Sequence, residues 1–504
     1  MKNSRKNGIF WLGAIFFGLL FTLAVTIAVA AVWADKTFAV DFGAMIYTLM
    51  SPLKGTGDDT IKSAIKDCVP PILAFVAVYC LAVFVLCQSS VRVTLVTPSG
   101  RRRLNLLKLF RRVGALGCVG SLFLSAAYAD RLLGIGKWVL GRMQDTTIYE
   151  DYYVDPNTVS ITAPEKAKNL IYIYLESGET TYASVEEGGR QPVNYIPYMT
   201  QLAKDNISFS DKETLGGFIS PTGTTWTIAA LFASTSGLPF AFPVGTNEMN
   251  QRESFATGVT ALGDILKNAG YQMEFLCGSN ADFGGRKSYF EQHGAYTIFD
   301  YYTAIEKGYI PADHYVWWGL EDAILYEIAK DEVTRLAAAD EPFNLTFLTV
   351  DQHHSGGYVC ELCGDDYSEP LGNVLACSDR LLADFIAWCE QQDFYEDTVI
   401  VITGDHPRMD NIFVDGVPFE ERTIYNCFIH AAAQVEGSQK NRVATTMDVF
   451  PTTLAALGFT IEGDRLGLGT NLFSARETLA EQLGYDYLNN ELGKSSLYYI
   501  TNFS

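Results

Sequence analysis

Positive charge is scarce in this chain of 504 residues, in which 37 lysines and arginines stand against 58 aspartates and glutamates. The deficit lies after the first 130 residues, because 23 of the basic and 52 of the acidic side chains occur from Arg131 onward. That part therefore carries a formal charge near −29. Such a surface repels polyanions and anionic lipid. This excludes nucleic acid as a general partner and means that any membrane attachment must come from elsewhere in the chain.

Repeats and low-complexity tracts are also absent, and the long uncharged runs are confined to the N-terminal part. Ile9 to Ala34 and Val69 to Ser90 are long enough to cross a bilayer, and Val113 to Ala129 is a shorter third run. The first run exceeds the apolar region of a signal peptide, which is about 7 to 15 residues. The sequence predicts a membrane domain over residues 1–130, with transmembrane helices at about 9–34, 69–90 and 113–129.

Acidic residues are missing between the second and third apolar runs, a segment that is rich in basic ones. The basic residues there are Arg92, Arg101, Arg102, Arg103, Lys108, Arg111 and Arg112, and the N-terminus carries Lys2, Arg5 and Lys6. Basic loops face the cytoplasm. Three crossings then put everything after about Asp130 outside the cytoplasmic membrane of a bacterium.

Six of the ten cysteines lie in the outer part, where disulfides persist. They are Cys277, Cys360, Cys363, Cys377, Cys389 and Cys427. We expect disulfides here, with unreadable connectivity. A zinc site built from the Cys360-x2-Cys363 pair with Cys377 and Cys389 is an alternative, as are free thiols.

Residues 131–165 are predicted to form an amphipathic linker and tether. "RLLGIGKWVLGRM" interleaves apolar, basic and glycine positions, which favours a helix in the membrane interface with Trp138 at headgroup level. A plain connecting helix is the alternative. The polar, proline-containing stretch that follows is typical of a domain boundary. Residues 166–504 then form the extracytoplasmic domain.

From Asn169 onward, short apolar runs alternate with helical stretches, which indicates an α/β domain with a largely parallel sheet. Four runs read as strands: "NLIYIYLES", "GYQMEFLCG", "FNLTFLTVDQHH" and "DTVIVITGDH". Glu176, His353, Asp405 and His406 fall at their carboxyl ends. Functional residues gather at that edge of such sheets.

The residues at these strand ends have the chemistry of metal ligands. A carboxylate beside an imidazole, as in Asp405-His406, suits Mn²⁺ or Zn²⁺, and Glu176 adds a third ligand. A capping aspartate with a hydrogen-bonded histidine is the alternative. Thr224, in "PTGTTWTIAAL", is predicted to lie at a helix N-terminus, where a coordinated hydroxyl becomes a nucleophile. A simple helix cap is the alternative for Thr224.

These motifs, in this order, resemble those of the membrane-anchored phosphoglycerol transferases and lipoteichoic acid synthases of the alkaline phosphatase and sulfatase-like superfamily. The resemblance covers roughly Asn169 to Phe473. Its carriers are "YLES", "GTTWTIAAL", "LTVDQHH" and "GDHPRM", with "TTMDVFPTTLAALG" near Thr445 as the closing segment. It implies an alkaline phosphatase/sulfatase-like domain with a mostly parallel sheet flanked by helices.

The resemblance also implies roles. Glu176, Thr224, Asp405 and His406 would hold one divalent cation, usually Mn²⁺, with Mg²⁺ or Zn²⁺ as alternatives. Thr224 would take glycerol phosphate from phosphatidylglycerol and pass it to an envelope glycan or a polyglycerolphosphate chain. His353 and Arg286 would bind the substrate. Without the resemblance, Arg286 reads as a surface ion-pair partner and His353 as a structural loop histidine.

Two departures concern the headgroup pocket. Where lipoteichoic acid synthases carry a histidine and a tryptophan upstream of the arginine, this chain has Cys277 or Gly278, and Gly284. A phosphoethanolamine transferase of the same superfamily is therefore one rival, and a non-catalytic envelope sensor or scaffold is another. A sulfatase activity is disfavoured, because the nucleophile segment lacks a cysteine or serine followed two residues later by proline and then arginine.

Overall fold

The computed structural model describes residues 2–38, 42–43, 45–46, 59–88, 94–97, 100–103, 106–242 and 256–503. It divides into two compact units. One comprises Met1–Phe38 and Asp58–Lys137, and the other comprises Ala39–Gly57 and Trp138–Ser504.

The first unit consists of three long helices and a short hairpin. The helices are α1 (Lys2–Thr37), α3 (Asp59–Gln88) and α4 (Leu106–Leu133), and the hairpin pairs β1 (Thr94–Thr97) with β2 (Gly100–Arg103). Within them, Trp11–Thr37, Lys62–Val85 and Val113–Leu133 are long and apolar enough to cross a membrane. The predicted runs 9–34 and 113–129 lie on α1 and α4, and the run 69–90 lies on α3 up to Gln88, with residues 89 and 90 outside the described residues. The protein is therefore membrane-anchored.

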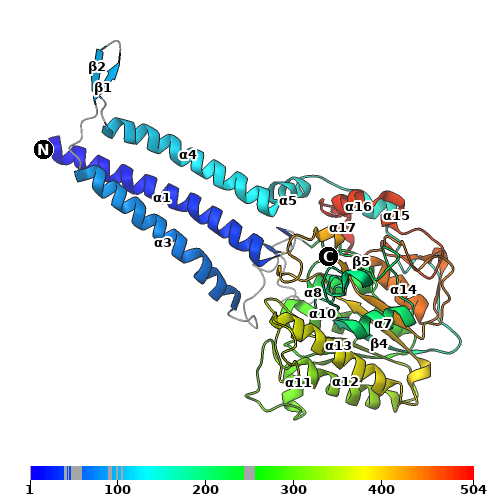
Figure 1. The fold of residues 1–504 in the computed structure, drawn as a ribbon. Coiled ribbons are helices and arrows are strands. Elements are labelled where there is room, and N and C mark those ends of the chain that lie inside the picture. The colour runs from blue at the N-terminus through cyan, green and yellow to red at the C-terminus, as the bar shows by residue number, and fades with distance from the viewer. Residues whose placement is uncertain are drawn as a thin grey trace. The chain divides into compact units, whose positions relative to one another are not determined.

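Helix α1 packs against both α3 and α4 (Figure 1). Gly18 lets α3 come close, since an added Cβ there would lie 2.7 Å from the Tyr79 ring. The Tyr79 hydroxyl donates to the carbonyl of Ala14 at 2.6 Å. Small residues allow such close packing where no hydrophobic force drives apolar helices together in lipid.

The second unit is built on a six-stranded sheet in the order β11-β9-β4-β8-β6-β7. The strands are β11 (Asn426–Ile429), β9 (Thr398–Gly404), β4 (Asn169–Leu175), β8 (Phe343–Leu348), β6 (Gln272–Cys277) and β7 (Thr297–Phe299). All neighbours pair in parallel except β11, which is antiparallel to β9. The predicted α/β class with a mostly parallel sheet is confirmed.

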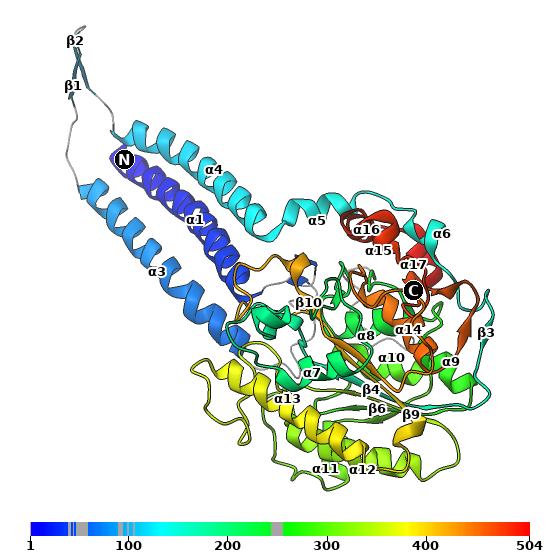
Figure 2. The same cartoon turned by 45° about the vertical axis from the view of Figure 1, so that its right-hand side comes forward.

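Both faces of the sheet are buried, which explains why β4 is a continuous apolar run. Leu170, Tyr172 and Tyr174 belong to one core, while Ile171 and Ile173 belong to the other. Figure 2 shows α12 (Asp322–Ala337) and α13 (Pro370–Cys389) on one side of the strands and α8 (Thr227–Ser236), α10 (Arg286–Gln292) and α14 (Val449–Ala456) on the other. Side chains of α8, α10 and α14 belong to the core that contains Tyr172, and side chains of α12 and α13 belong to the core that contains Ile171.

Smaller elements complete the second unit. Further α-helices are α5 (Ile135–Arg142), which spans the boundary between the two units, α6 (Ile148–Tyr152), α7 (Pro197–Asp205), α9 (Leu262–Asn268), α11 (Tyr301–Glu306), α15 (Leu479–Leu483), α16 (Tyr485–Leu492) and α17 (Leu497–Phe503). Strand β3 (Ile161–Thr162) pairs with β12 (Thr460–Ile461), β5 (Phe218–Ile219) with β10 (Thr423–Ile424), and β13 (Arg465–Leu466) with β14 (Gly469–Thr470). The segment before β4 is thus tied to the C-terminal part of the unit.

Candidate active site

Parallel pairing of β4 with β9 brings two of the predicted ligands side by side. Leu175, the last residue of β4, is in register with Gly404, the last residue of β9. Glu176 and Asp405 follow these residues directly, and the Asp405 amide donates to the Leu175 carbonyl at 3.1 Å. Because carboxyl ends of parallel strands share one edge of the sheet, residues distant in sequence meet here.

Glu176, Asp405 and His406 form a tight, buried group. Their potential ligand atoms all lie within 4.8 Å of one another. His406 Nε2 is 3.4 Å from Asp405 Oδ2 and 3.7 Å from Glu176 Oε1. None of the three residues is more than 2% exposed. Burying two carboxylates without a compensating positive charge costs free energy, so a bound cation would stabilise this arrangement.

The hydrogen bonds of the group leave ligand atoms available. Asp405 Oδ1 accepts from the amides of Ser177 at 2.8 Å and His406 at 2.7 Å, whereas Oδ2 has no hydrogen-bond partner among the described residues. The Ser177 hydroxyl donates to Glu176 Oε1 at 2.7 Å. His406 Nδ1 lies 2.9 Å from the Pro407 carbonyl, which orients Nε2 toward the carboxylates, as is usual for a metal-binding histidine.

The pKa values of the three side chains are shifted by burial and by their mutual charges. Burial and the neighbouring Glu176 raise the pKa of Asp405 to about 7. Burial opposes protonation of His406, yet Asp405 and Glu176 outweigh it and raise the pKa of the imidazole. Burial likewise opposes ionisation of Glu176, but His353 and His406 lower its pKa overall. Two carboxylates and an imidazole fit Mn²⁺, Mg²⁺ or Zn²⁺ by ligand chemistry.

The helix that follows Thr224 begins later than the sequence suggests. Helix α8 starts at Thr227, because Trp226 is extended (φ −146°, ψ 158°) and caps it. The prediction that Thr224 lies at the helix N-terminus is wrong, because the helix begins at Thr227. Thr224 instead lies in the turn after Gly223, fully buried, and its hydroxyl donates to the Pro221 carbonyl at 2.9 Å.

Thr227, in the same segment, contacts the buried group. Its hydroxyl is 3.3 Å from His406 Nε2. Sequence reasoning did not single it out, although it lies in the same run of threonines. Its place in the first turn of α8 is the signal that would have found it, since backbone N–H groups are unpaired there.

His353 and Arg286 are joined by two aromatic rings that the sequence did not reveal. The Trp318 ring centroid is 4.4 Å from that of His353 and 5.5 Å from that of Phe283. The Arg286 guanidinium lies 5.8 Å from the Phe283 centroid. His353 in turn interacts electrostatically with Glu176. A row of side chains, here called the aromatic wall, thus runs from the buried group of Glu176 to Arg286.

Arg286 is an internal residue and not a surface ion-pair partner, since it is 5% exposed. Its Nε donates to the Phe283 carbonyl at 3.1 Å, and Nη2 donates to Ser279 Oγ at 3.0 Å and to the Asn280 carbonyl at 2.7 Å. These partners lie in the segment after β6, at the same edge of the sheet. They fix the guanidinium in a defined position beside the aromatic wall.

Arg408 connects two loops of the site, and the sequence analysis did not single it out. It is fully buried, and its Nε and Nη2 hold both oxygens of Asp410 at 2.5 Å. Its Nη1 donates to the Gln352 carbonyl at 2.6 Å, next to His353. The loop after β9 is therefore bound to the loop after β8. A bidentate arginine is a rigid connector of this kind.

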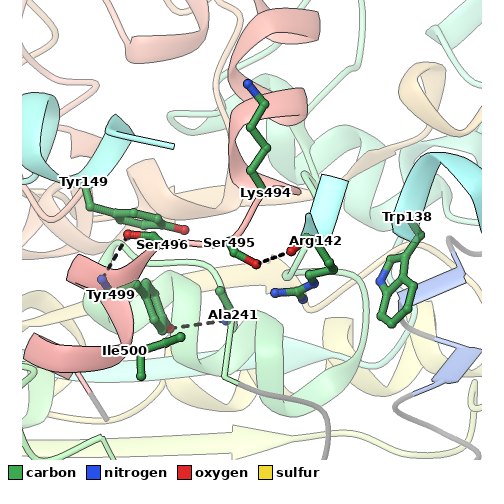
Figure 3. A pocket seen from close by; sticks show the side chains of 9 residues that line it. All are labelled: Trp138, Arg142, Tyr149, Ala241, Lys494, Ser495, Ser496, Tyr499 and Ile500. Carbon is green, nitrogen blue, oxygen red and sulfur yellow. Dashed lines mark hydrogen bonds between the residues drawn. The ribbon is translucent and has the colours of Figure 1, made fainter. Parts of the chain in front are cut away.

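A cavity of about 190 Å³ lies elsewhere in the same unit (Figure 3). The Ser495 hydroxyl in its wall donates to the Arg142 carbonyl at 2.8 Å, and the Lys494 ammonium pairs with Glu491. Its lining comprises Trp138, Arg142, Tyr149, Ala241, Lys494, Ser495, Ser496, Tyr499 and Ile500. None of the predicted site residues lines it.

The family of the chain can now be stated. Residues 168–459 match the family model described as Sulfatase, which covers more than half of the chain. The chain belongs to the sulfatase family. The predicted superfamily is thereby confirmed, and the matched range of this sulfatase-family domain contains all six predicted site residues.

Curated relatives of the sulfatase-family chain include phosphoglycerol transferase I of Xanthomonas axonopodis pv. citri (strain 306), 30% identical over 359 residues, which are 68% of this chain and 49% of the relative. Phosphoglycerol transferase I of Escherichia coli O127:H6 is 32% identical over 338 residues, which are 64% of this chain and 41% of the relative. The chain thus spans about half the length of the curated relatives it matches.

Among solved structures, the lipoteichoic acid synthase LtaP of Listeria monocytogenes aligns with a TM-score of 0.48 at 17% identity, over 65% of this chain and 80% of that one. The lipooligosaccharide phosphoethanolamine transferase EptA of Neisseria meningitidis aligns with a TM-score of 0.47 at 14% identity, over 88% of this chain and 84% of that one.

Proposed function

We propose that this protein is a membrane-anchored, metal-dependent phosphoglycerol transferase of the bacterial envelope. It would move glycerol phosphate from phosphatidylglycerol to an envelope glycan or a polyglycerolphosphate chain. The observation that carries the proposal is the buried group of Glu176, Asp405 and His406, in which Asp405 Oδ2 has no hydrogen-bond partner among the described residues. The names of the curated relatives support the same activity.

The reaction has two steps with a covalent intermediate on a threonine. The Thr224 oxygen attacks phosphorus, the bond to the diacylglycerol oxygen breaks, and diacylglycerol leaves with the proton that threonine gives up. An acceptor hydroxyl then attacks the same phosphorus and restores the threonine hydroxyl. A bound divalent cation, Mn²⁺ by family resemblance, supplies the charge neutralisation that phosphoryl transfer requires.

Thr224 is our first choice of nucleophile because of its motif, and Thr227 is the competitor. For Thr224 to act, its hydroxyl must leave the Pro221 carbonyl, to which it donates at 2.9 Å. Thr227 already lies 3.3 Å from His406 Nε2. If Thr224 is the nucleophile, Thr227 orients His406, and the two roles are separable by substitution.

Arg286 and His353 are proposed to bind the glycerol-phosphate headgroup. A fixed guanidinium pairs well with phosphate oxygens. The Trp318 and Phe283 rings between the two residues offer an apolar face for the glycerol carbons. Arg286 and His353, at the two ends of the aromatic wall, would therefore set the position of the phosphate.

The domain assignment is part of the proposal. Residues 1–130 would span the membrane three times, residues 131–165 would link the two parts, and residues 166–504 would work outside the cytoplasmic membrane. The basic segments at the N-terminus and at 92–112 would face the cytoplasm. The donor lipid would then lie in the same leaflet that the catalytic domain faces.

The test is release of diacylglycerol from vesicles of phosphatidylglycerol or phosphatidylethanolamine by the full-length protein with Mn²⁺. We expect release from phosphatidylglycerol and its loss in Thr224→Ala. Release from phosphatidylethanolamine alone would indicate a phosphoethanolamine transferase. No release from either lipid would favour a non-catalytic sensor or scaffold.

A further inference from the structure

Three cysteines meet in the core of the second unit, in a group separate from the proposed active site. Cys360 and Cys363 lie between β8 and α13, and Cys377 lies on α13. Cys360 Sγ is 3.4 Å from Cys363 Sγ and 3.7 Å from Cys377 Sγ. All three residues are buried, and their sulfur atoms lie within 4.8 Å of one another.

The spacing of the sulfur atoms does not correspond to a disulfide. A disulfide bond is about 2.0 Å long, and the structure records all six cysteines of the outer part as free. The expected disulfides are therefore absent from it. Tetrahedral zinc with Zn–S bonds of about 2.3 Å separates its sulfur ligands by roughly 3.7 Å. The two sulfur–sulfur distances of 3.4 and 3.7 Å are near that value.

We propose that Cys360, Cys363 and Cys377 together bind one thiophilic divalent cation, Zn²⁺ by preference, through three thiolates. A disulfide would use two of the sulfurs and leave the third unpaired, whereas one cation uses all three. Soft sulfur ligands select such metals. The site is independent of the proposed function and has a different ligand chemistry from the group at the sheet edge.

Hydrogen bonds around the sulfurs fit this role. The Cys360 amide donates to Cys363 Sγ at 3.2 Å. Hydrogen bonding to the charged form of a group favours that form, and a metal binds the thiolate, not the thiol. The turn is closed by the Cys363 amide, which donates to the Cys360 carbonyl at 3.1 Å. The short Cys-x2-Cys turn thus presents both sulfurs to one point.

Three thiolates leave the fourth position of a tetrahedral cation to another ligand. Asp351 is 3% exposed, and its Oδ1 has no hydrogen-bond partner among the described residues. It interacts electrostatically with Cys363. Asp351 does not belong to the group whose ligand atoms lie within 4.8 Å of one another, so a water molecule would take this position, and the proposal depends only on the three sulfurs.

A cation at this site would hold the loop that follows β8 against α13. This loop carries His353 before it reaches Cys360 and Cys363, and the cation would bind it to Cys377 on α13. Irregular segments gain order when a metal closes them, because ligand binding then contributes to folding. The cation would hold the His353 loop in the conformation that the structure shows.

The experiment is Co²⁺ titration of the reduced, metal-free, full-length protein in detergent. Co²⁺ bound by thiolates absorbs strongly in the near ultraviolet by sulfur-to-metal charge transfer, whereas oxygen and nitrogen ligands do not. We expect this band to saturate at one equivalent and to disappear when Zn²⁺ is added. Cys363→Ser and Cys377→Ala should lose the band. Cys389→Ser, a buried cysteine of α13 outside the group, should keep it.

Three results would overturn the proposal. One is a disulfide among these cysteines, found by mass spectrometry in protein purified without reductant, together with no band after reduction. Another is no band in folded wild type. The third is a band that survives both Cys363→Ser and Cys377→Ala. Circular dichroism checks that each variant is folded. Asp405→Asn should keep the band while losing transferase activity. Failure of the cysteine site is therefore distinguishable from failure of the proposed function.

Discussion

Among its described residues, the second unit contains two buried groups of three potential metal ligands, and the two groups differ in almost every other respect. Glu176, Asp405 and His406 offer oxygen and nitrogen at the carboxyl edge of the sheet, on two neighbouring parallel strands. The group of Cys360, Cys363 and Cys377 offers only sulfur, inside the core between a loop and α13. The proposed uses differ with location, since ligands of open α/β sheets bind outside the carboxyl ends of the strands.

The contrast in ligand type implies a contrast in metal. Hard oxygen ligands suit cations that activate phosphate chemistry, and soft thiolates suit cations that hold a fold together. One protein would therefore separate a catalytic cation from a structural one by ligand chemistry alone. Substitution and chelation can therefore alter one group while leaving the other intact.

The largest effect is expected from Asp405→Asn. It weakens the carboxylate group at the sheet edge and should lower diacylglycerol release from phosphatidylglycerol by at least about 10² to 10³-fold, as when charge stabilisation of a transition state is removed. The exposed Asp415 provides the control, because Asp415→Asn changes charge equally without touching the group. Near-normal activity in Asp405→Asn would remove the group from the mechanism.

Metal removal should separate the two groups next. Dialysis against a chelator is expected to abolish transfer, and Mn²⁺ should restore it, because carboxylates hold cations less tightly than thiolates do. The Zn²⁺ content that remains after dialysis should depend on Cys363 and not on Asp405. Elemental analysis of wild type, Cys363→Ser and Asp405→Asn measures this. Equal zinc loss from wild type and Cys363→Ser would contradict it.

A smaller effect is expected at the aromatic wall. Trp318→Ala should raise the KM for phosphatidylglycerol by about fivefold, since an aromatic contact contributes about 1 kcal/mol beyond its buried area. Trp318→Phe should recover most of this loss. A fall in kcat with unchanged KM would instead assign Trp318 to the chemical step.

The smallest of the four effects on activity is expected from Gly404→Ala, although it should reduce stability. An added Cβ at Gly404 would lie 2.0 Å from the carbonyl oxygen of Gly178, so the two strand ends that carry the ligands would have to separate. We expect a loss of about 1 to 3 kcal/mol in the free energy of unfolding, the usual cost of overpacking. Denaturant unfolding measures it, and unchanged stability would show that the strand ends tolerate separation.

Much of the sheet edge was predictable from sequence. Apolar runs marked β4 and β9, and each is followed directly by a charged or imidazole side chain, so the amino-acid pattern alone groups Glu176, Asp405 and His406. Parallel strands end at one edge, which supplies the proximity without knowledge of the register.

Long-range contacts were not predictable in this way. Trp318 reaches His353 from an irregular segment that has no periodicity, and the extended Trp226 delays the start of α8. The cysteine spacing suggested a site but included Cys389. Cys377 and Cys389 lie on one helix, where twelve residues span roughly 18 Å, so they cannot share an ion.

Peptide mapping of the full-length protein by mass spectrometry, after incubation with Mn²⁺ and phosphatidylglycerol, tests transfer through a threonine ester most directly. We expect a glycerol-phosphate adduct on Thr224 that is absent from Thr224→Ala and disappears when acceptor is added. An adduct on Thr227 would correct the nucleophile. The absence of any adduct, in protein that binds Mn²⁺ and phosphatidylglycerol, would contradict transfer through a threonine ester.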